Sequence, residues 1–166
     1  MPDVVLDTNS LADFLSTFLA HRSESGGSQT EHTCLSSQAT ALIRRIRLQY
    51  ESSGVIRDLV IASSLAFVEI ARKWDDIVRG RFESYQFAAF LNQPPEWFSV
   101  APMDEDLVLF FCEVPTHACL GGGILRAVEW TDAVHVATVI SRGDTCQLVT
   151  TDNVLRAIDC LNGRLL

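Results

Sequence analysis

The stretch Val4-Val5-Leu6-Asp7-Thr8-Asn9 decides how this chain is predicted to fold. Its first three residues fit a short strand buried on both faces, and polar residues with turn and helix-capping chemistry follow at once. The residues from Leu11 onward are typical of an apolar helix. The stretch therefore predicts a strand that leads into a helix, which is the repeating unit of α/β folds.

The same pattern recurs along the chain. Apolar runs predict further strands at 59–62, 98–100 and 147–150, and helices are expected at about 38–51, 65–71, 82–91, 104–111, 131–140 and 154–158. Alternating strands and helices favour a parallel sheet covered on both faces. Because 166 residues suit a single core, we expect one domain over residues 1–166, a three-layer α/β/α sandwich around a central parallel sheet.

Two stretches depart from this pattern. Residues 21–37 are rich in Ser, Gly, Thr and Gln and predict an exposed loop, which together with the Arg-bearing helix after it forms an insertion at about 21–57. The Gly121-Gly122-Gly123 run predicts a flexible break. No phosphate-binding Lys follows that run, which argues against a nucleotide cradle.

The composition narrows the class of protein. No apolar run approaches the ~18 residues of a membrane-spanning helix and the start of the chain is not basic, so we expect no membrane partner and a soluble, cytoplasmic protein. Five cysteines without a C-x-x-C pair argue against a disulfide framework or a zinc knuckle, and we expect them to be small buried groups.

Charge argues against one kind of nucleic-acid binding. A formal net charge of −8 disfavours a sequence-specific DNA-binding protein, but it disfavours a nuclease less, because bound metal ions would offset clustered acids. Twelve of the thirteen basic residues are Arg, and Arg44, Arg45 and Arg47 form a dense cluster. Planar guanidinium groups grip phosphate, although the cluster fits a solvated helix face equally well.

Four carboxylates stand at informative places. Asp7 and Asp152 follow predicted strands, Asp132 stands at a predicted helix start, and Glu69 lies in the second turn of another helix. The carboxyl ends of parallel strands share one rim, where α/β folds place their ligand sites. Crowded carboxylates raise each other's pKa unless a hard cation such as Mg²⁺ or Mn²⁺ neutralises them. The pattern therefore predicts a divalent-metal site.

The same acids have simpler explanations. Asp132 and Asp152 fit helix N-caps equally well. Glu69 fits that explanation less well, because Phe67, Val68 and Ile70 place it in an apolar stretch where a charge needs a partner.

Several neighbours are candidates for supporting the four acids. Thr8, Asn9 and Thr151 are expected to orient the carboxylates or bound water by hydrogen bonds, or else to cap helices. His135 lies one turn after Asp132 and could share its face as a ligand, but we expect a packed or supporting imidazole in preference.

For two further side chains we expect ordinary structural roles. Trp130 is expected to pack beneath the site in preference to stacking a base. Asp13, two turns beyond Asp7, is expected to face solvent.

The residues resemble a known family in four segments. Val4-Val5-Leu6-Asp7-Thr8-Asn9, Ser63-Ser64-Leu65-Ala66-Phe67-Val68-Glu69-Ile70, Trp130-Thr131-Asp132-Ala133-Val134-His135-Val136-Ala137 and Leu148-Val149-Thr150-Thr151-Asp152 are similar to the four motifs of PIN domains, in the family's order. The resemblance spans nearly the whole chain. The long connection at 21–57 departs from the compact toxins of that family.

The resemblance implies a function and a site. It implies a PIN-like α/β/α sandwich that cleaves RNA with Mg²⁺ or Mn²⁺, often as the VapC-type toxin of a toxin–antitoxin pair. By carry-over, Asp7, Glu69, Asp132 and Asp152 form the acidic quartet. An RNA substrate and an antitoxin protein are then the expected partners.

Other functions stay open. The fold could serve as a protein-interaction module without nuclease activity. An aspartyl-nucleophile phosphohydrolase could also use Asp7, but such enzymes place a second Asp where this chain has Asn9. A homodimer could form through the apolar helical surfaces at 82–91 and 107–111, although these surfaces could equally belong to the core.

Overall fold

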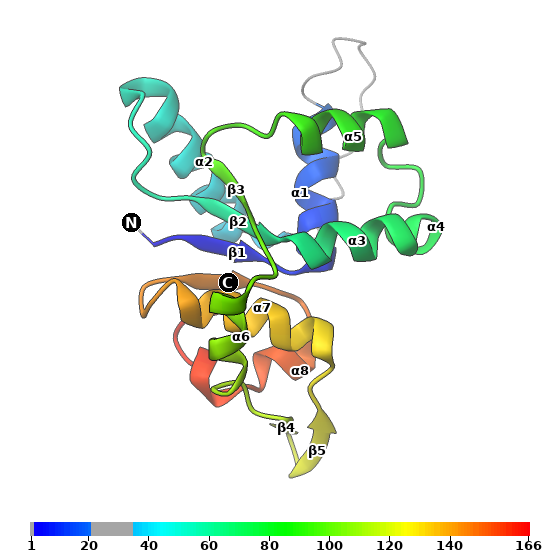
Figure 1. Cartoon of the computed structure of the whole chain (residues 1–166), viewed down its shortest axis with the longest axis vertical. Helices are drawn as coiled ribbons and strands as arrows, with labels where there is room; N and C mark the ends of the chain where they lie inside the picture. Colours follow the sequence, from blue (N-terminus) through cyan, green and yellow to red (C-terminus); the bar gives the residue numbers. More distant parts are fainter. Residues whose placement is uncertain (1, 21–34) are drawn as a thin grey trace.

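A four-stranded parallel sheet forms the centre of the computed structural model, which describes residues 2–20 and 35–166 (Figure 1). Its strands lie in the order β3-β2-β1-β6, so β1 has a partner on both sides. Val5 pairs with Ile61 of β2 and with Leu148 of β6. The strands are β1 (Val4–Leu6), β2 (Val60–Ser63), β3 (Phe98–Ala101) and β6 (Gln147–Val149). The predicted α/β class and parallel sheet are confirmed.

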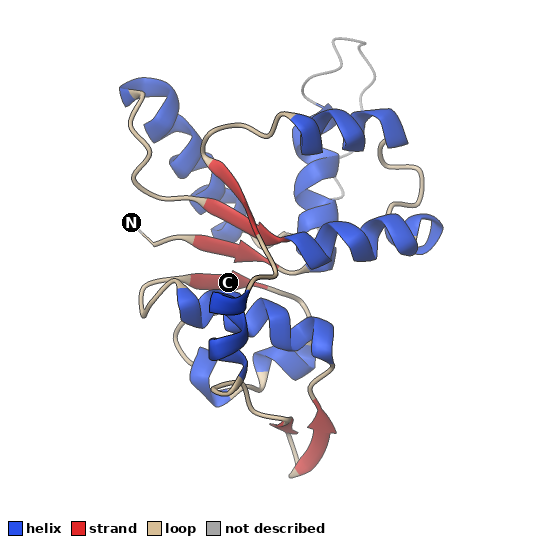
Figure 2. Ribbon diagram, in the orientation of Figure 1, coloured by secondary structure: helices blue, strands red, loops and turns tan. Residues whose placement is uncertain are grey.

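Helices cover both faces of this sheet (Figure 2). On one face lie α1 (Thr8–Ala20), α2 (Ser37–Ser53), α3 (Ser64–Arg72), α4 (Trp74–Ile77) and α5 (Ser84–Asn92). On the other lie α6 (Glu105–Phe111), α7 (Trp130–Ser141), α8 (Asn153–Arg156) and a 3-10 turn at Asp159–Leu161. This arrangement is compatible with three layers.

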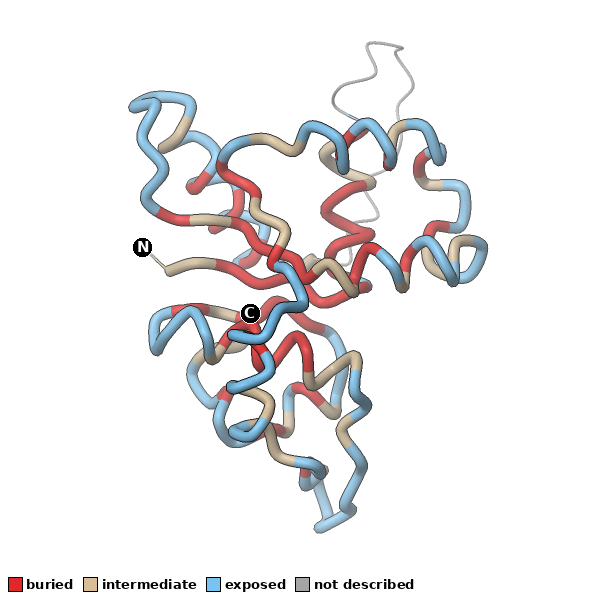
Figure 3. Tube along the Cα trace, in the orientation of Figure 1, coloured by how far each residue is buried: buried red, intermediate tan, exposed pale blue. Residues whose placement is uncertain are grey.

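Side-chain alternation along the strands explains the two faces. Val4 and Leu6 of β1 belong to the apolar cluster under α1–α5, whereas Val5 between them belongs to the cluster under α7 and α8. Successive strand residues point to opposite faces, so a fully apolar strand fills both clusters. Burial is accordingly densest along the strands and the inner sides of α1 and α7 (Figure 3).

The insertion predicted at about 21–57 is described in part. Residues 21–34 of the predicted loop lie outside the described residues. The helix expected after them is α2, in which Leu42, Ile43 and Ile46 are buried. Ser36 caps this helix by accepting a hydrogen bond from the Ala39 N–H.

An antiparallel hairpin replaces the predicted flexible break at 121–123. Strands β4 (His117–Leu120) and β5 (Ile124–Ala127) pair, and the glycines form the turn between them. Gly122 and Gly123 have φ values of 81° and 79°, a left-handed conformation that glycine adopts without strain. Every residue of β5 is exposed, although Ile124, Leu125 and Ala127 are apolar. The hairpin projects from the body beyond α7 and α8 (Figure 1).

The expectation that Asp13 faces solvent is wrong. Its side chain is buried, and Arg81 from the segment before α5 donates a hydrogen bond to its carboxylate. Arg81 also donates to the Ile77 carbonyl at 2.6 Å. The ion pair therefore ties α1 to the end of α4.

The cysteine expectation is right at one position. Cys146 is buried, and burial raises the pKa of its thiol to about 12. Cys112, Cys119 and Cys160 are exposed, contrary to expectation, while Cys34 lies outside the described residues. All four described cysteines are free thiols.

The last residues of the chain pair with the outer side of β6. Leu148 donates its N–H to the Arg164 carbonyl at 2.7 Å and accepts from the Leu166 N–H at 2.9 Å. These bonds extend the sheet by a short bridge. Across the described residues, none of the helices has the length and apolar character needed to cross a membrane.

Candidate functional site

One cavity gathers the four predicted acids. Asp7, Glu69, Asp132 and Asp152 all line a cavity of about 390 Å³ at the carboxyl ends of β1 and β6. They come from the end of β1, the middle of α3, the first turn of α7 and the residue before α8. Residues up to 145 positions apart in sequence thus share one site, as parallel strands with short connections permit.

Asp7 is the most deeply placed of the four. Its side chain is 4% exposed, and Oδ1 accepts a 2.7 Å hydrogen bond from the Ser10 N–H in the first turn of α1. The Ser10 hydroxyl donates to the Val149 carbonyl at the end of β6. The first turn of α1 therefore holds Asp7 in place and is itself fixed to the neighbouring strand.

Glu69 has both carboxylate oxygens engaged. The Thr8 hydroxyl donates to Oε2, and the Lys73 ammonium donates to Oε1, both at 2.7 Å. Burial acts to raise the pKa of Glu69, but the hydrogen bonds from Lys73 and Thr8 outweigh it and hold the pKa below its ordinary value. The partners that a charge in an apolar stretch needs thus come from the start of α1 and from the end of α3.

His135 lies behind Thr8, as a packed imidazole. It is 2% exposed, and its Nε2 is 3.3 Å from the Thr8 hydroxyl oxygen. Burial lowers the pKa of His135, while the negative charges of Asp7 and Glu69 act to raise it. Burial has the larger effect, and the lowered pKa favours a neutral ring. Within the described part of the chain, its Nδ1 is buried and has no hydrogen-bond partner.

Asp132 has a raised pKa that reflects its burial and the other acids of the site. It is the third residue of α7, whose N-cap is Glu129, so Asp132 does not cap that helix. Burial, together with the nearby charges of Asp152, Glu129, Asp7 and Glu69, raises the pKa of Asp132 to about 6. Each of the other predicted acids therefore lies within electrostatic reach of Asp132.

Asp152 combines the two roles that its sequence position left open. Its Oδ1 caps α8 by accepting from the N–H groups of Val154 and Leu155, and the residue also lines the acidic cavity. Thr150 fixes the turn before it, since the Thr150 hydroxyl oxygen accepts a 3.0 Å hydrogen bond from the Asp152 N–H. Neutralising Asp152 would accordingly affect both the cavity and α8.

The predicted supporting residues divide into two groups. Thr8 and Asn9 line the cavity, and Thr8 is bonded to Glu69. Thr151 is exposed and contributes nothing to the cavity wall, so the threonine that orients Asp152 is Thr150.

Three charged residues of the cavity were not among the predicted site residues. Glu129, Lys73 and Arg126 line it from the N-cap of α7, the end of α3 and strand β5. Arg126 could not be placed because the hairpin was not predicted. A stronger signal existed for Lys73, which lies one helical turn after Glu69 and so on the same face.

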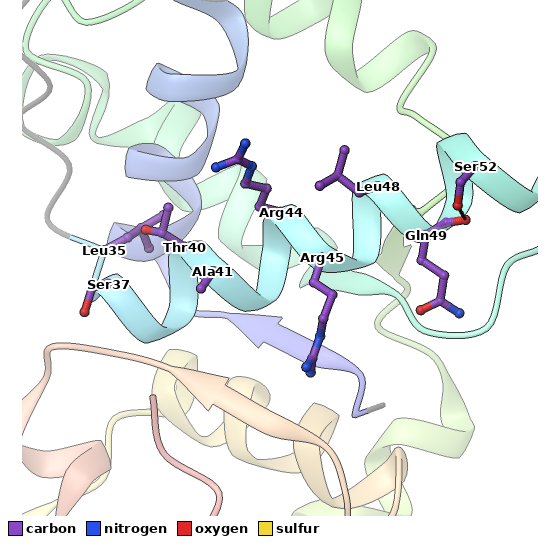
Figure 4. A pocket seen from close by; sticks show the side chains of 9 residues that line it. All are labelled: Leu35, Ser37, Thr40, Ala41, Arg44, Arg45, Leu48, Gln49 and Ser52. Atoms are coloured by element: carbon purple, nitrogen blue, oxygen red, sulfur yellow. Dashed lines mark hydrogen bonds between the residues drawn. The ribbon is translucent and has the colours of Figure 1, made fainter.

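The arginine cluster of α2 lies elsewhere. Arg44 and Arg45 line an open groove of about 1010 Å³ on the outer side of that helix and point away from one another (Figure 4). Arg47 pairs with Glu51 at 2.7 Å. None of the three lines the acidic cavity. This placement favours the solvated helix face over a role beside the four acids.

The donor groups of the cavity fit a hard divalent cation. Carboxylate oxygens are the ligands that Mg²⁺ and Mn²⁺ prefer, and the mutual repulsion expressed in the raised pKa of Asp132 is relieved by positive charge. In the parts of the chain that the structure describes, no three His, Cys, Asp or Glu side chains already enclose a place for an ion. Glu69 in particular is paired with Lys73.

Comparison with known proteins assigns no relative: no family matches this chain, and no curated protein or solved structure is significantly similar to it. The chemistry of the cavity therefore has to be argued from its residues.

Proposed function

We propose that this protein is a divalent-metal-dependent endoribonuclease of PIN-like fold, in which Asp7, Glu69, Asp132 and Asp152 hold the metal. One observation carries the proposal. Four acids that the sequence motifs single out, from four separate segments, line one cavity. If each acid had only a structural role in its own segment, nothing would require the four side chains to line the same cavity.

The electrostatics of the cavity support metal binding in particular. Helix capping accounts for Asp152, and the ion pair with Lys73 accounts for Glu69. Neither accounts for Asp132, which caps nothing and whose pKa is raised by burial and by the acids around it. Protein sites contain such clusters of carboxylates where a bound cation offsets their negative charge. Mg²⁺ or Mn²⁺, when bound, would lower the pKa of water and offset charge on a phosphate.

The chain's own residues then have defined tasks. Asp7 is pre-positioned by Ser10, and Glu69 is positioned by Thr8, with neutral His135 packed behind that hydroxyl. Arg126 and Lys73 supply the positive charge in the cavity that a phosphodiester backbone needs.

The resemblance of four segments to PIN motifs supports RNA as the substrate. An antitoxin protein is proposed as a partner on the same resemblance. The homodimer is proposed separately, from exposed apolar residues such as Val108 and Leu109, which are 58% and 70% exposed on α6. A cytoplasmic location stays a prediction from the sequence.

The test is cleavage of a mixed RNA pool by purified protein with Mn²⁺ or Mg²⁺. We expect EDTA to abolish cutting, and a folded Asp7→Asn, Asp132→Asn double variant to lower it by at least ~100-fold. Asp106→Asn is the matched control, because Asp106 is an exposed acid in the first turn of α6. Absence of cutting together with absence of Mn²⁺ binding by calorimetry would refute the proposal and favour an interaction module.

A further inference from the structure

Lys73 is the only lysine of this chain, since the other twelve basic residues are arginines. It lies at the junction of α3 and α4 and lines the acidic cavity. Its Nζ donates to Glu69 Oε1 at 2.7 Å, and its side chain is 54% exposed while that of Glu69 is 16% exposed. The single ammonium group of the chain's side chains is therefore paired with one of the four proposed metal ligands.

We infer that Lys73 is a built-in counter-cation of the metal site. It holds Glu69 while no metal is bound, releases Glu69 when a divalent cation enters, and is then free to bind a substrate phosphate. This inference rests on the proposed metal-dependent function. It adds that Lys73 competes with the metal for Glu69 and, once displaced, binds the substrate phosphate.

The surroundings of Glu69 favour a displacement, because an ammonium 2.7 Å from Oε1 and a divalent cation on the same carboxylate repel each other. Oε2 accepts from the Thr8 hydroxyl and Oε1 accepts from Lys73. Thr8 is buried at the start of α1 with His135 beside it, so its hydroxyl is fixed by its surroundings. Lys73 has a long, half-exposed stem. Of the two donors, Lys73 is the one that can withdraw without disturbing the core.

The type of residue fits this role. An ammonium is a compact charge on a flexible chain, whereas a guanidinium binds a carboxylate through two parallel hydrogen bonds. An i,i+4 pair of this kind changes an equilibrium by only about twofold. A divalent cation with several carboxylate ligands therefore displaces Lys73 readily. The displaced ammonium remains at the cavity wall, where it can bind phosphate as a point charge.

A single lysine makes the displacement directly observable. Reductive methylation with ¹³C-formaldehyde keeps the positive charge and labels one side chain, apart from the α-amino group, so NMR reports Lys73 alone. We expect the Lys73 signal to shift on titration with Mg²⁺, with the midpoint that calorimetry gives for binding. A signal that stays unchanged while Mg²⁺ binds would overturn the inference and leave the proposed metal site standing.

Two charge-matched variants separate competition from a general field effect. Lys73→Met and Arg72→Met each remove one positive charge from the end of α3, but Arg72 does not line the cavity. We expect Lys73→Met to raise Mg²⁺ affinity about twofold to fourfold, and Arg72→Met to raise it by less than about 1.5-fold. Equal effects of the two variants would overturn competition at Glu69.

The phosphate role has its own readout. At saturating Mg²⁺, we expect Lys73→Met to lower kcat/KM for RNA about tenfold although its metal binding is tighter, while unchanged kcat/KM would refute this role. If neither wild type nor Lys73→Met binds Mg²⁺, the proposed function fails as well.

Discussion

Neutralising Asp132 should stabilise the metal-free protein. At pH 7.5 without metal, the folded protein carries Asp132 as a charged group against its burial and against Asp152, Glu129, Asp7 and Glu69. Asp132→Asn keeps the size of the side chain and removes the charge. We therefore expect the variant to be more stable than wild type in EDTA, although it loses a proposed metal ligand.

The magnitude follows from the pKa. The pKa of Asp132 is about 6 when folded and near 3.8 when unfolded, and a difference of ~2.2 corresponds to ~3 kcal/mol. Solvent screens a partly exposed carboxylate, so we expect about half, or ~1.5 kcal/mol. A raised pKa favours the protonated folded state; hence this stability is present below about pH 4 and is lost as pH rises through 6. At pH 5, the gain in unfolding free energy of Asp132→Asn over wild type should therefore be roughly half of its value at pH 7.5.

Thermal unfolding in EDTA measures this effect. For a chain of this length, ~1.5 kcal/mol corresponds to a Tm increase of ~3–6 °C at pH 7.5. The exposed control Asp106→Asn should show no increase. With Mn²⁺ at ~100 times its Kd, wild type should gain ~2.7 kcal/mol and become the more stable protein. If Asp132→Asn is no more stable than wild type in EDTA at pH 7.5, the proposed crowding of charge is wrong.

Three further substitutions test separate parts of the structure. Thr8→Val removes the hydroxyl that positions Glu69 and should weaken Mn²⁺ binding about 10–100-fold by calorimetry. Trp130→Ala should leave urea unfolding within ~0.5 kcal/mol of wild type, because Trp130 is 61% exposed; if it stacks an RNA base, RNA affinity should fall about tenfold in a fluorescence anisotropy titration. Arg81→Met leaves buried Asp13 without its cation and should cost ~3 kcal/mol in urea unfolding without changing Mn²⁺ affinity.

Each substitution has a control. Thr8→Ser keeps the hydroxyl and should restore most Mn²⁺ affinity. Tyr85→Ala removes an aromatic residue that is 71% exposed on α5 and should not change RNA affinity. Unchanged RNA affinity in Trp130→Ala would exclude base stacking. A normal unfolding energy in Arg81→Met would show that the pair with Asp13 contributes little, and a change in its metal affinity would link that pair to the site.

Much of this fold could be predicted because its strands are buried on both faces. The segments Val4–Leu6 and 60–62 have no solvent-facing side, so their residues are apolar without interruption and stand out in the sequence. Asp7 could be predicted as a site residue for the same reason, since it ends such a run. Its register with β6 then determines that Asp152 lies near it.

The features that sequence reasoning missed depend on exposed or distant residues. Strand β5 has only four residues, and Ile-Leu-Arg-Ala shows no alternation of polar and apolar residues, so the hairpin was not predicted and Arg126 could not be assigned to the cavity. Asp13 and Arg81 are 68 positions apart, and only the packing of α1 against the α4–α5 segment brings them together. Trp130 was expected to be packed but is 61% exposed, because it is the first residue of α7 and lies at the helix end.

The two outer strands of the sheet, β3 and β6, differ in whether the backbone of their outer side is hydrogen-bonded. The backbone of Leu148 in β6 is bonded to Arg164 and Leu166, whereas β3 has a strand partner only at β2 among the described residues. A strand with unpaired backbone groups on one side can recruit another strand. Intermolecular pairing on mild heating should therefore begin at Phe98–Ala101, and a proline in place of Val100, whose N–H points away from β2, would test that route by removing one backbone donor.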